Sequence, residues 1–467
     1  MFVVIITIFL VLFSFVYDYV RNKRKFDLVD EFPGPRLMPF IGNAYNYAAK
    51  SSEDVIKLIL ESHKTYGQSY RTKIYNEATI WTSDLKIISS ILVNNTKAIT
   101  KSPLYNFLKP WLGEGLLTGT GKKWRAERKV MAPMFHSKYF EYFVHVFNRH
   151  GENLVNKLKS YEDGDAVDII SLIYLTALDS ICEIGCGEQI DALNNSDSEY
   201  VQAVTETINQ FSSDAIRRRR AYLLDNKSKD DVGDDDVANK IVFIDLLLQG
   251  SADGKPLDDD AILDQVNTLT FNGRNSSPVA IAFVLYALGQ HIDVQQTLFK
   301  EIKYVFGSDK SDPITIQQLQ ELPYLDSVIK EAMRLYPPIP AVARYIEEDI
   351  RLDDGRYIPA ATSLAMTLFV AFRDPSAFPE PNEFNPDRFD LNGGVSSRID
   401  PFAFIPFSSG PRNCIGQRYA LLLIKTVVVQ ILRNYEIVSK GEAPILFPQI
   451  VLRSKNGVQI GLKNRVY

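Results

Sequence analysis

The residues most able to do chemistry lie in one short loop near the C-terminal end of the chain. In the stretch FSSGPRNCIGQRYA, residues 407–420, Cys414 stands between Gly410 and Gly416, and Arg412 lies two positions before it. Glycine lets a backbone approach another group closely. The apolar run that follows predicts a helix, whose N-terminus would stabilise a thiolate. The loop therefore presents Cys414 as a candidate metal ligand.

No other residues of the chain have the spacing of a metal site. Three cysteines are too few for a disulfide framework, and Cys182 and Cys186, one helical turn apart, are interpreted as small core residues. Paired zinc spacing is missing among the five histidines, His63, His136, His145, His150 and His291. A single thiolate suits a haem iron better than a bare zinc ion, and the permanent charge of Arg412 suits a haem propionate. The alternative is a buried structural cysteine in a Gly-Pro loop.

The cysteine loop carries a family resemblance. Phe407, Gly410, Arg412, Cys414 and Gly416 have the types and spacing of the haem-binding loop of the cytochrome P-450 superfamily, which the chain resembles over nearly its whole length. The resemblance implies that Cys414 ligates the iron. It also implies haem b (iron protoporphyrin) as the cofactor.

Two further motifs precede that loop in the order that the superfamily has. KEAMRLYPP places Glu331 and Arg334 one helical turn apart, which resembles the Glu-x-x-Arg helix of the superfamily, and FPEPNEFNPDRF supplies Arg388 as the third member. Buried charges are costly unless they satisfy one another. We therefore expect these three residues to form a structural ion-pair network on the haem side of the core.

The resemblance also assigns residues to the edge of the haem. In KKWRAERKVMAPMFH, Trp124 and Arg128 match the propionate-binding helix of the superfamily, and Arg344 stands where another propionate partner is common. Taken alone, WRAER is typical of a surface amphipathic turn. With Arg412, these residues are predicted to hold the propionates.

The distal helix departs from the family pattern. Its segment, FNGRNSSPVA, has Asn275 and Ser276 where the family has an acid and a threonine that relay protons to dioxygen. Serine keeps a hydroxyl donor, but asparagine cannot cycle a proton as a carboxylate does. Pro278 removes one N–H from the helix and favours a kink. Asn272 replaces a glutamate that is ester-linked to haem in part of the family, so we expect non-covalent haem.

The elements around these motifs predict a mainly α protein with a minor β part. Apolar residues recur at helical spacing over 53–67, 138–164 and 279–291, and strand-like pieces lie at 69–83 and 349–369. The charge runs at 217–220 and 229–236 are interpreted as solvated faces or loops. With the resemblance, this implies the cytochrome P-450 fold, with haem between a long distal helix and the proximal cysteine loop. The pocket roof, near residues 200–220, is shorter than in the family.

The N-terminus has the pattern of a membrane anchor. An uncharged run over 2–17 is followed by the basic cluster RNKRK at 21–25. A helix through residue 20 is about 28 Å long, close to the ~30 Å of a bilayer core. The alternative, a cleaved signal peptide, lacks a small-residue cleavage site. The sequence predicts an N-terminal anchor helix over 1–20, a basic stop and proline-rich linker over 21–45, and a haem-thiolate catalytic domain over 46–467.

The resemblance, closest to the microsomal ω-hydroxylase-like branch seen in arthropods, implies a function. It implies a monooxygenase that inserts one oxygen atom of O2 into a lipophilic substrate (fatty-acid-like, hormone or xenobiotic) at the endoplasmic reticulum membrane, with the catalytic domain in the cytosol. Electrons would come from NADPH–cytochrome reductase, with cytochrome b5 as an optional second partner. The net charge of −5 gives no nucleic-acid footprint. The altered proton relay and roof leave two alternatives: a haem-binding pseudoenzyme, or an oxygen-independent isomerase or dehydratase.

Overall fold

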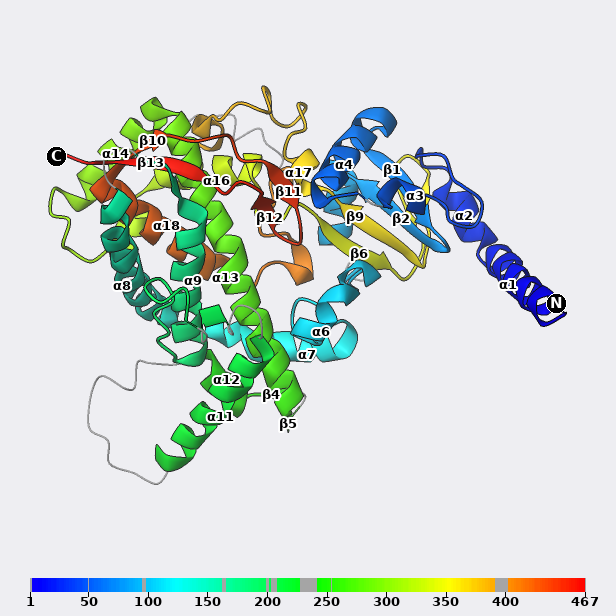
Figure 1. The fold of residues 1–467 in the computed structure, drawn as a ribbon, viewed down its shortest axis with the longest axis horizontal. Coiled ribbons are helices and arrows are strands. Elements are labelled where there is room, and N and C mark those ends of the chain that lie inside the picture. The colour runs from blue at the N-terminus through cyan, green and yellow to red at the C-terminus, as the bar shows by residue number, and fades with distance from the viewer. Residues whose placement is uncertain are drawn as a thin grey trace.

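The computed structural model describes residues 2–48, 50–94, 98–161, 165–198, 201–202, 208–226, 242–252, 254–390 and 402–466. Helices dominate, and the strands form small sheets (Figure 1). The predicted mainly α class with a minor β part is confirmed.

The α-helices have these bounds: α1 (Phe2–Arg21), α2 (Lys23–Val29), α3 (Ala44–Tyr47), α4 (Ser52–Tyr66), α5 (Leu85–Ser89), α6 (Lys109–Leu112), α7 (Gly121–Met131), α8 (Phe140–Leu158), α9 (Ile169–Cys186), α11 (Ile208–Asn226), α12 (Phe243–Gln249), α13 (Asp259–Gln290), α14 (Ile292–Phe306), α15 (Ile316–Gln320), α16 (Pro323–Leu335), α17 (Leu368–Ala371) and α18 (Gln417–Asn434). Shorter helical turns used below are η1 (Ser90–Asn94), η3 (Ala132–Phe135), η6 (Pro386–Phe389) and η8 (Gly410–Arg412).

The strands have these bounds: β1 (Ser69–Ile74), β2 (Glu77–Thr82), β3 (Val167–Asp168), β4 (Ser251–Ala252), β5 (Lys255–Pro256), β6 (Val342–Ile346), β7 (Ile350–Arg351), β8 (Tyr357–Ile358), β9 (Thr362–Met366), β10 (Tyr435–Ser439), β11 (Leu446–Pro448), β12 (Leu452–Ser454) and β13 (Gln459–Asn464).

The helical core is built around α13. This 32-residue helix begins at Asp258, whose carboxylate accepts a hydrogen bond from the Ala261 N–H at 2.7 Å, and it continues through Pro278. It packs against α9, α16 and α18, while α8 packs against α9 and α18. Cys182 and Cys186 on α9 are both buried, as the sequence predicted. The core therefore holds the long distal helix between α9 and the helix that follows the cysteine loop.

The main sheet lies to one side of this core, in the order β1-β2-β9-β6 (Figure 1). β1 and β2 form an antiparallel hairpin, β2 pairs parallel with β9, and β6 pairs antiparallel with β9. Both strand-like pieces of the sequence contribute to this sheet. Its buried face makes a second hydrophobic cluster with η1 and α17, separate from the helical core.

The N-terminal helix α1 projects from the body, at the right of Figure 1. It exposes large apolar side chains along its length, including Phe9 and Phe13. By length and apolar composition, one helix of the described residues qualifies as a candidate membrane span, and this is α9, of which 83% is buried. The bent pair α13 and α14 passes the same test jointly. Because α9 is a core helix, the anchor at 1–20 stays a prediction that the exposed apolar side chains of α1 support.

The segment predicted as a linker, 21–45, contacts the sheet. Phe26 and Val29 on α2 are buried. The Asp30 carboxylate accepts hydrogen bonds from Arg71 Nε at 2.8 Å and from Lys73 Nζ at 2.7 Å, both on β1. The boundaries at residues 20 and 45 stay predictions, but the intervening chain is held on the body.

The four arginines at 217–220 lie on α11, and each has a carboxylate partner. Arg217, Arg218 and Arg220 are exposed, as predicted for a solvated face. Arg219 differs, because it is half-buried and binds both oxygens of Asp245 on α12 at 2.6 and 2.7 Å. The second charge run, 229–236, lies outside the described residues.

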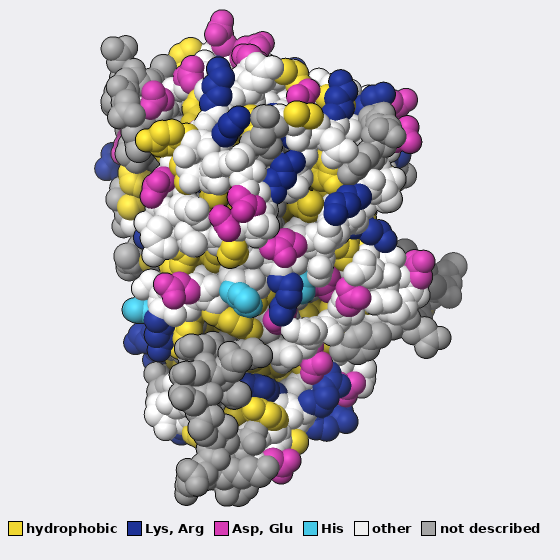
Figure 2. Space-filling model, turned by 90° about the vertical axis from the view of Figure 1, so that its left-hand side faces the viewer, with side chains coloured by type: hydrophobic (Ala, Val, Ile, Leu, Met, Phe, Trp, Pro, Cys, Tyr) yellow, Lys and Arg dark blue, Asp and Glu magenta, His cyan; other side chains and the backbone are white. Residues whose placement is uncertain are grey.

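The face toward α8 and α14 carries acidic and basic side chains interspersed with hydrophobic ones (Figure 2). A large patch of one charge sign is the usual footprint of a nucleic-acid-binding surface. No such patch dominates this view of the described residues.

Candidate active site

The cysteine loop is a tight, backbone-bonded turn between η8 and α18. The Cys414 N–H donates to the Phe407 carbonyl at 2.9 Å, and the Asn413 N–H donates to the Gly410 carbonyl at 3.0 Å. Cys414 is exposed, whereas the two cysteines of α9 are buried. Of the three thiols, only this one can therefore reach an external ligand.

Glycine is required at position 410. Its φ is +71°, and a Cβ there would come within 1.8 Å of the Leu92 carbonyl oxygen on η1. Gly416 differs, since a Cβ would meet only the Phe135 ring at 3.4 Å. The sequence attributed both glycines to a close approach of the loop to the macrocycle. At Gly410 the structure supplies another reason, which is contact with η1.

Burial and the neighbouring polar groups shift the pKa of the Cys414 thiol in opposite directions. Burial raises its pKa, although the side chain is accessible, while the hydrogen bond from the Gly416 N–H and the charge of Arg128 lower it. Arg128 is fixed beside the loop, because its Nη2 donates to the backbone oxygen of Asn413 at 2.9 Å and to its side-chain oxygen at 2.6 Å. Thiol ligands ionise when they bind a metal cation. The loop therefore supplies the groups that favour a thiolate at that step.

Four cations converge beside this loop. The backbones of Lys101 and Arg344 are joined by an isolated bridge. The Arg412 guanidinium stacks on the Trp124 ring at 3.7 Å, and the Arg128 guanidinium lies 5.6 Å from the same ring. We call Lys101, Arg128, Arg344 and Arg412 the cation cluster.

The charges of the cation cluster act on one another. Burial, followed by the charges of Arg344 and Arg412, holds the pKa of Lys101 well below its usual value. Burial, followed by the charges of Arg344 and Arg128, lowers the pKa of Arg412 to about 9. These shifts indicate that the cluster has no compensating negative charge among the described residues.

The partners of the cation cluster among the described residues are uncharged. Arg412 donates to the carbonyls of Ile99, Leu116 and Gly119, and Arg344 donates to the Ala343 carbonyl at 3.1 Å. Lys101 lies over the Tyr105 ring at 4.3 Å. Buried cations without a counter-charge are costly. The cluster is therefore suited to receive an anionic group.

Trp124 supports the cluster through its ring. Its indole Nε1–H donates to the Leu116 carbonyl at 3.2 Å. Its ring provides the surface on which Arg412 stacks. The assignment of Trp124 to a propionate stays a prediction.

The distal residues Asn275 and Ser276 face different partners. Asn275 Nδ2 donates to the Phe271 carbonyl at 2.6 Å, and its oxygen accepts from Arg453 Nη2 on β12 at 2.8 Å. Ser276 Oγ donates to the Asn272 carbonyl at 3.2 Å. Both ends of the Asn275 amide are thus engaged, which leaves the Ser276 hydroxyl as the hydrogen-bonding group of this pair that can turn to another partner.

Other features of the distal segment come from packing. Gly273 lies against α9, since a Cβ there would come within 2.6 Å of the Ile181 side chain. Arg274 is half-buried, and burial, then the charge of Arg453, lowers its pKa. The structure places its charge near Arg453 and Tyr174.

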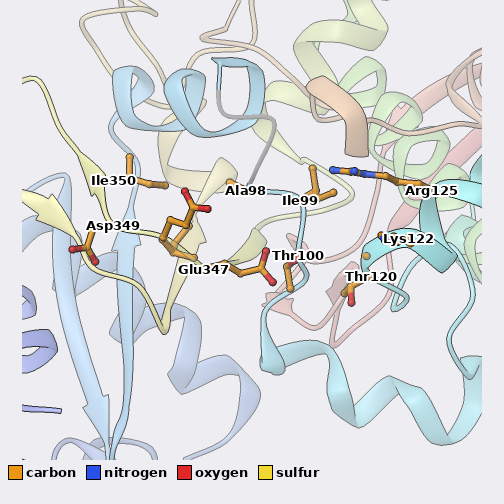
Figure 3. Close-up of a pocket in the computed structure, with 12 residues that line it drawn as sticks. Ala98, Ile99, Thr100, Thr120, Lys122, Arg125, Glu347, Asp349 and Ile350 are labelled. Carbon is orange, nitrogen blue, oxygen red and sulfur yellow. The ribbon is translucent and has the colours of Figure 1, made fainter. Parts of the chain in front are cut away.

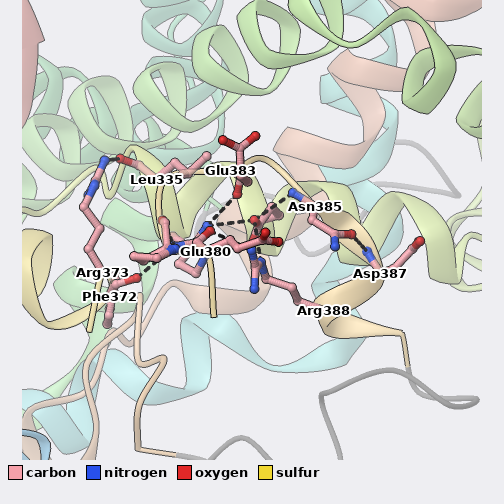
Figure 4. Close-up of polar contacts among 11 residues, drawn as sticks. Leu335, Phe372, Arg373, Glu380, Glu383, Asn385, Asp387 and Arg388 are labelled. Atoms are coloured by element: carbon pink, nitrogen blue, oxygen red, sulfur yellow. Dashed lines mark hydrogen bonds and ion pairs between the residues drawn. The ribbon is translucent and has the colours of Figure 1, made fainter. Parts of the chain in front are cut away.

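The three predicted network residues come together, and Figure 4 shows Arg388 and Asn385 among the polar contacts around them. Glu331 and Arg334 on α16 are both 0% exposed. Arg334 binds Glu331 through two hydrogen bonds of 2.7 and 2.8 Å, and Arg388 Nε on η6 reaches the same carboxylate at 3.3 Å. The carboxylate is therefore shared by two buried guanidinium groups and neutralises one of their two positive charges.

A cavity of about 350 Å³ is lined in part by Ile99 and Thr100, which directly precede Lys101 in the chain. Figure 3 shows Lys122 and Arg125 of α7 on one side and Glu347 and Asp349 on the other. Ile99 lines it, and the Ile99 carbonyl accepts a hydrogen bond from Arg412 Nε at 2.9 Å. The cavity thus lies against the peptide that supports Arg412.

Comparison with known proteins decides the family. The family model for cytochrome P450 matches residues 32–220 and 217–460. Cytochrome P450 4d2 of Drosophila melanogaster is 37% identical over 492 aligned residues, with 96% of each chain covered. The chain belongs to the cytochrome P450 family.

Other fly relatives agree. Cytochrome P450 4c3 of Drosophila melanogaster is 34% identical, with 98% of this chain and 95% of the relative covered. Cytochrome P450 4d1 of Drosophila simulans is 33% identical, with 96% of each covered. These matches bear out the predicted arthropod branch, and they make the protein a P450-type monooxygenase.

The residues of this P450 fit the haem that its family implies. Cys414 is an exposed soft ligand in a loop whose Gly410 lies against η1. In the part of the chain that the structure describes, the cation cluster has no partner with the negative charge that two propionates carry. A haem bound there supplies the oxygen-activating iron chemistry of the family. Cys414 would hold the iron, and Lys101, Arg128, Arg344 and Arg412 would hold the propionates.

Sequence reasoning missed Lys101 and Arg453. Lys101 is joined to Arg344 only through a bridge between distant segments, and Arg453 reaches Asn275 from β12. Neither lies in a motif. In the sequence, the one indication of a role for Lys101 is that it stands shortly before KPWLGEGLL (109–117), the stretch that leads to α7.

The P450 relatives also bear on the pocket roof. Cytochrome P450 4d2 aligns over 492 positions, more than the 467 residues of this chain, so it holds residues with no counterpart here. The two stretches that match the family model meet at 217–220, within α11. These facts support a shortened roof near α11. Residues 199–200 and 203–207, the start of the predicted roof, lie outside the described residues.

Proposed function

We propose that this P450 is a membrane-anchored haem-thiolate monooxygenase of the endoplasmic reticulum. It inserts one oxygen atom from O2 into a lipophilic substrate (fatty-acid-like, hormone or xenobiotic). The cofactor is haem b, held non-covalently, since Asn272 offers no carboxylate for an ester. Electrons come from an NADPH–cytochrome reductase, with cytochrome b5 as an optional second donor.

The observation that carries the proposal is the pairing of an exposed thiol with an unbalanced cation cluster. Cys414 is the one exposed cysteine, and the cluster beside it has lowered pKa values for Lys101 and Arg412. Two propionates would neutralise these charges. A planar, dianionic macrocycle with an iron that prefers sulfur meets both requirements at once.

The chain's own groups divide the remaining work. The Ser276 hydroxyl can donate a hydrogen bond toward the oxygen-binding side of the site. The Asn275 amide stays bound to Arg453 and to its own helix, so it orients rather than titrates. Proton delivery therefore depends on Ser276 and on water, which is consistent with slow turnover.

Exposed side chains support the proposed location and redox partners. α1 exposes an apolar surface directly before the basic residues at 21–25, which is the pattern of a cytosol-facing anchor. On the cysteine side, Lys122, Arg125 and Lys129 of α7 are exposed, as is Arg418 of α18. These basic side chains suit docking of an acidic electron donor.

The test is the absorption spectrum of the reduced, carbon-monoxide-bound full chain. The wild type is expected to give the red-shifted Soret band of thiolate ligation. Cys414→Ser should lose that band, because it removes the sulfur ligand. The matched control, Cys182→Ala on α9, should keep it. A wild-type band at the position of a neutral ligand, or no haem at all, would contradict the proposal.

A second candidate function has one observation in its favour. Since Asn275 is engaged at both ends and is not titratable, the site lacks the acid that oxygen activation uses in the family. Oxygen-independent chemistry on the same fold, an isomerase or dehydratase, does not need it. Turnover of a peroxide or an oxime without NADPH would identify that function. Haem binding without any turnover would identify a pseudoenzyme.

A further inference from the structure

One backbone carbonyl binds both an aromatic and a cationic side chain of the proposed propionate site. The Leu116 carbonyl, in the loop before α7, accepts from Trp124 Nε1 at 3.2 Å and from Arg412 Nη1 at 3.3 Å. Arg412 in turn stacks on Trp124 at 3.7 Å. We call Leu116, Trp124 and Arg412 the propionate clamp. The placement of the Leu116 peptide sets the position of the other two side chains.

A buried glutamine on α13 holds Leu116 through the neighbouring peptide group. The Leu116 N–H donates to Gln265 Oε1 at 3.1 Å, and Gln265 Nε2 donates to Glu127 Oε2 on α7 at 2.9 Å. Gln265 is 0% exposed and Glu127 is 3% exposed. Hydrogen bonds therefore link the Glu127 carboxylate through Gln265 to the backbone of Leu116, whose carbonyl belongs to the clamp.

The direction of the Gln265 amide depends on the charge of Glu127. An ionised carboxylate only accepts hydrogen bonds, so it draws the Gln265 NH2 group and leaves the Gln265 oxygen facing the Leu116 N–H. A protonated carboxyl can also donate. It then permits the reversed amide, which would present NH2 to the Leu116 N–H and lose that bond.

Burial and the groups that face Glu127 bring its pKa close to neutral pH. Burial raises the pKa of Glu127 to about 7, Lys123 at 3.9 Å lowers it, Asp264 and Asp258 raise it, and the Gln265 hydrogen bond lowers it. Of the elements packed against α7, η3 and β4 carry no charged side chain, and Asp245 of α12 is paired with Arg219. Two of these groups are themselves engaged, since Asp264 accepts from the Glu114 N–H at 2.8 Å and Asp258 caps α13.

We propose that Gln265, oriented by the Glu127 carboxylate, is a positioning residue for the propionate clamp, so that haem is held more tightly when Glu127 is ionised. This inference rests on the proposed haem site. Gln265 touches neither the iron ligand nor a propionate-binding guanidinium directly. It acts through the Leu116 peptide.

The experiment measures haem transfer from the reconstituted holoprotein to excess apomyoglobin, together with the reduction potential, from about pH 5.5 to 8.5, a range that spans the Glu127 pKa. Wild type is expected to release haem more slowly as pH rises through about 7. Gln265→Leu should release it about 10- to 100-fold faster at high pH, the effect of one or two lost hydrogen bonds. Glu127→Gln keeps donor and acceptor, so it should show the low-pH wild-type rate at every pH.

Gln295→Leu is the matched control. Gln295 is also a buried amide, bonded to the carbonyls of Leu288 and Ile437 at 2.9 and 2.8 Å, but it lies on α14. Its loss should lower stability without changing the haem transfer rate, its pH profile or the potential. If Gln265→Leu matches Gln295→Leu in all three, or if Glu127→Gln keeps the wild-type pH profile, the inference is overturned while the haem site stands. A wild type without a thiolate Soret band would overturn the haem site itself.

Discussion

Two clusters of charge in this fold, the network around Glu331 and the cation cluster, are built in different ways. The Glu331 carboxylate is shared by Arg334 and Arg388, and its Oε1 also accepts from the Asn385 N–H at 2.9 Å. The other donors of Arg334 bind the carbonyls of Phe372, Pro381 and Glu383 at 3.0, 2.6 and 3.0 Å. This network contains a carboxylate of its own, which neutralises one of the two guanidinium charges.

The cation cluster is incomplete within the described chain. Burial and the charge of Arg344 lower the pKa values of Lys101 and Arg412, and the hydrogen bonds of Arg344 and Arg412 go to carbonyls. The comparison separates two uses of buried charge in one fold. The Glu331 network, which contains a carboxylate of its own, maintains the scaffold, whereas the cation cluster, which has no carboxylate partner among the described residues, stores binding energy for an anion that binds later.

The largest expected effect is the loss of stability when the network of Glu331, Arg334 and Arg388 is broken. Glu331→Gln removes the one negative charge and leaves Arg334 and Arg388 buried without a counter-ion, which costs about 3–5 kcal/mol of unfolding free energy. Urea unfolding followed by circular dichroism measures it. A loss below about 1 kcal/mol would show that the network does not maintain the scaffold.

Removing a charge from the cation cluster should not destabilise the haem-free protein, in contrast to the Glu331 network. Arg344→Met replaces a buried, unbalanced guanidinium by an apolar chain, so the haem-free protein should be equally stable or more stable. The holoprotein should release haem about 10- to 100-fold faster, because one charge-assisted bond to a propionate is lost. Unfolding of the haem-free form and haem transfer from the holoprotein test the two halves separately. Destabilisation of the haem-free form would place Arg344 with the scaffold instead.

The pH dependence of the haem-free protein sharpens the contrast. The pKa of Lys101 is lowered in the folded state, so near its folded pKa the unfolded chain binds more protons. Stability therefore rises as the pH approaches the ordinary lysine value of about 10.4. The expected gain is on the order of 1 kcal/mol and should be missing from Lys101→Met. A gain of equal size in both proteins would assign it to other groups.

The smallest effect concerns Arg453, whose partner is an amide rather than a carboxylate. Asn275→Asp would pair Arg453 with an anion and restore a titratable group beside Ser276. We expect a stability change within about 1 kcal/mol and a larger fraction of NADPH oxidation that yields product. The ratio of product to NADPH consumed measures this. An unchanged ratio would show that proton delivery bypasses this position.

The sequence predicted the parts of the site that are local or carried by motifs. Glu331 and Arg334 lie on one face because they are one helical turn apart, and the hairpin of β1 and β2 follows from alternating residues. The Cys414 loop was predicted as rigid. Its requirement for Gly410 comes from the Leu92 carbonyl, however, and that contact is tertiary.

What the sequence could not predict depends on contacts between distant segments. Lys101 joins the cation cluster through a bridge to β6, and Arg219 was predicted on a solvated face but is bound by Asp245 of α12. The hydrogen bond from the Trp124 indole N–H to Leu116 also joins segments that no motif relates. In each case the side-chain type was informative, and the partner was set by packing.

The junction between α1 and α2 has a mechanical consequence. Because Phe26 is buried, Asp30 is clamped by Arg71 and Lys73, and Arg24 binds Asp349, α2 cannot swivel freely on the sheet. Only Asn22 separates α1 from α2, and its N–H bonds to the Asp18 carbonyl. The two helices thus form a rigid connection to the body and not a flexible linker. A surface that binds α1 would therefore also fix the orientation of the whole body.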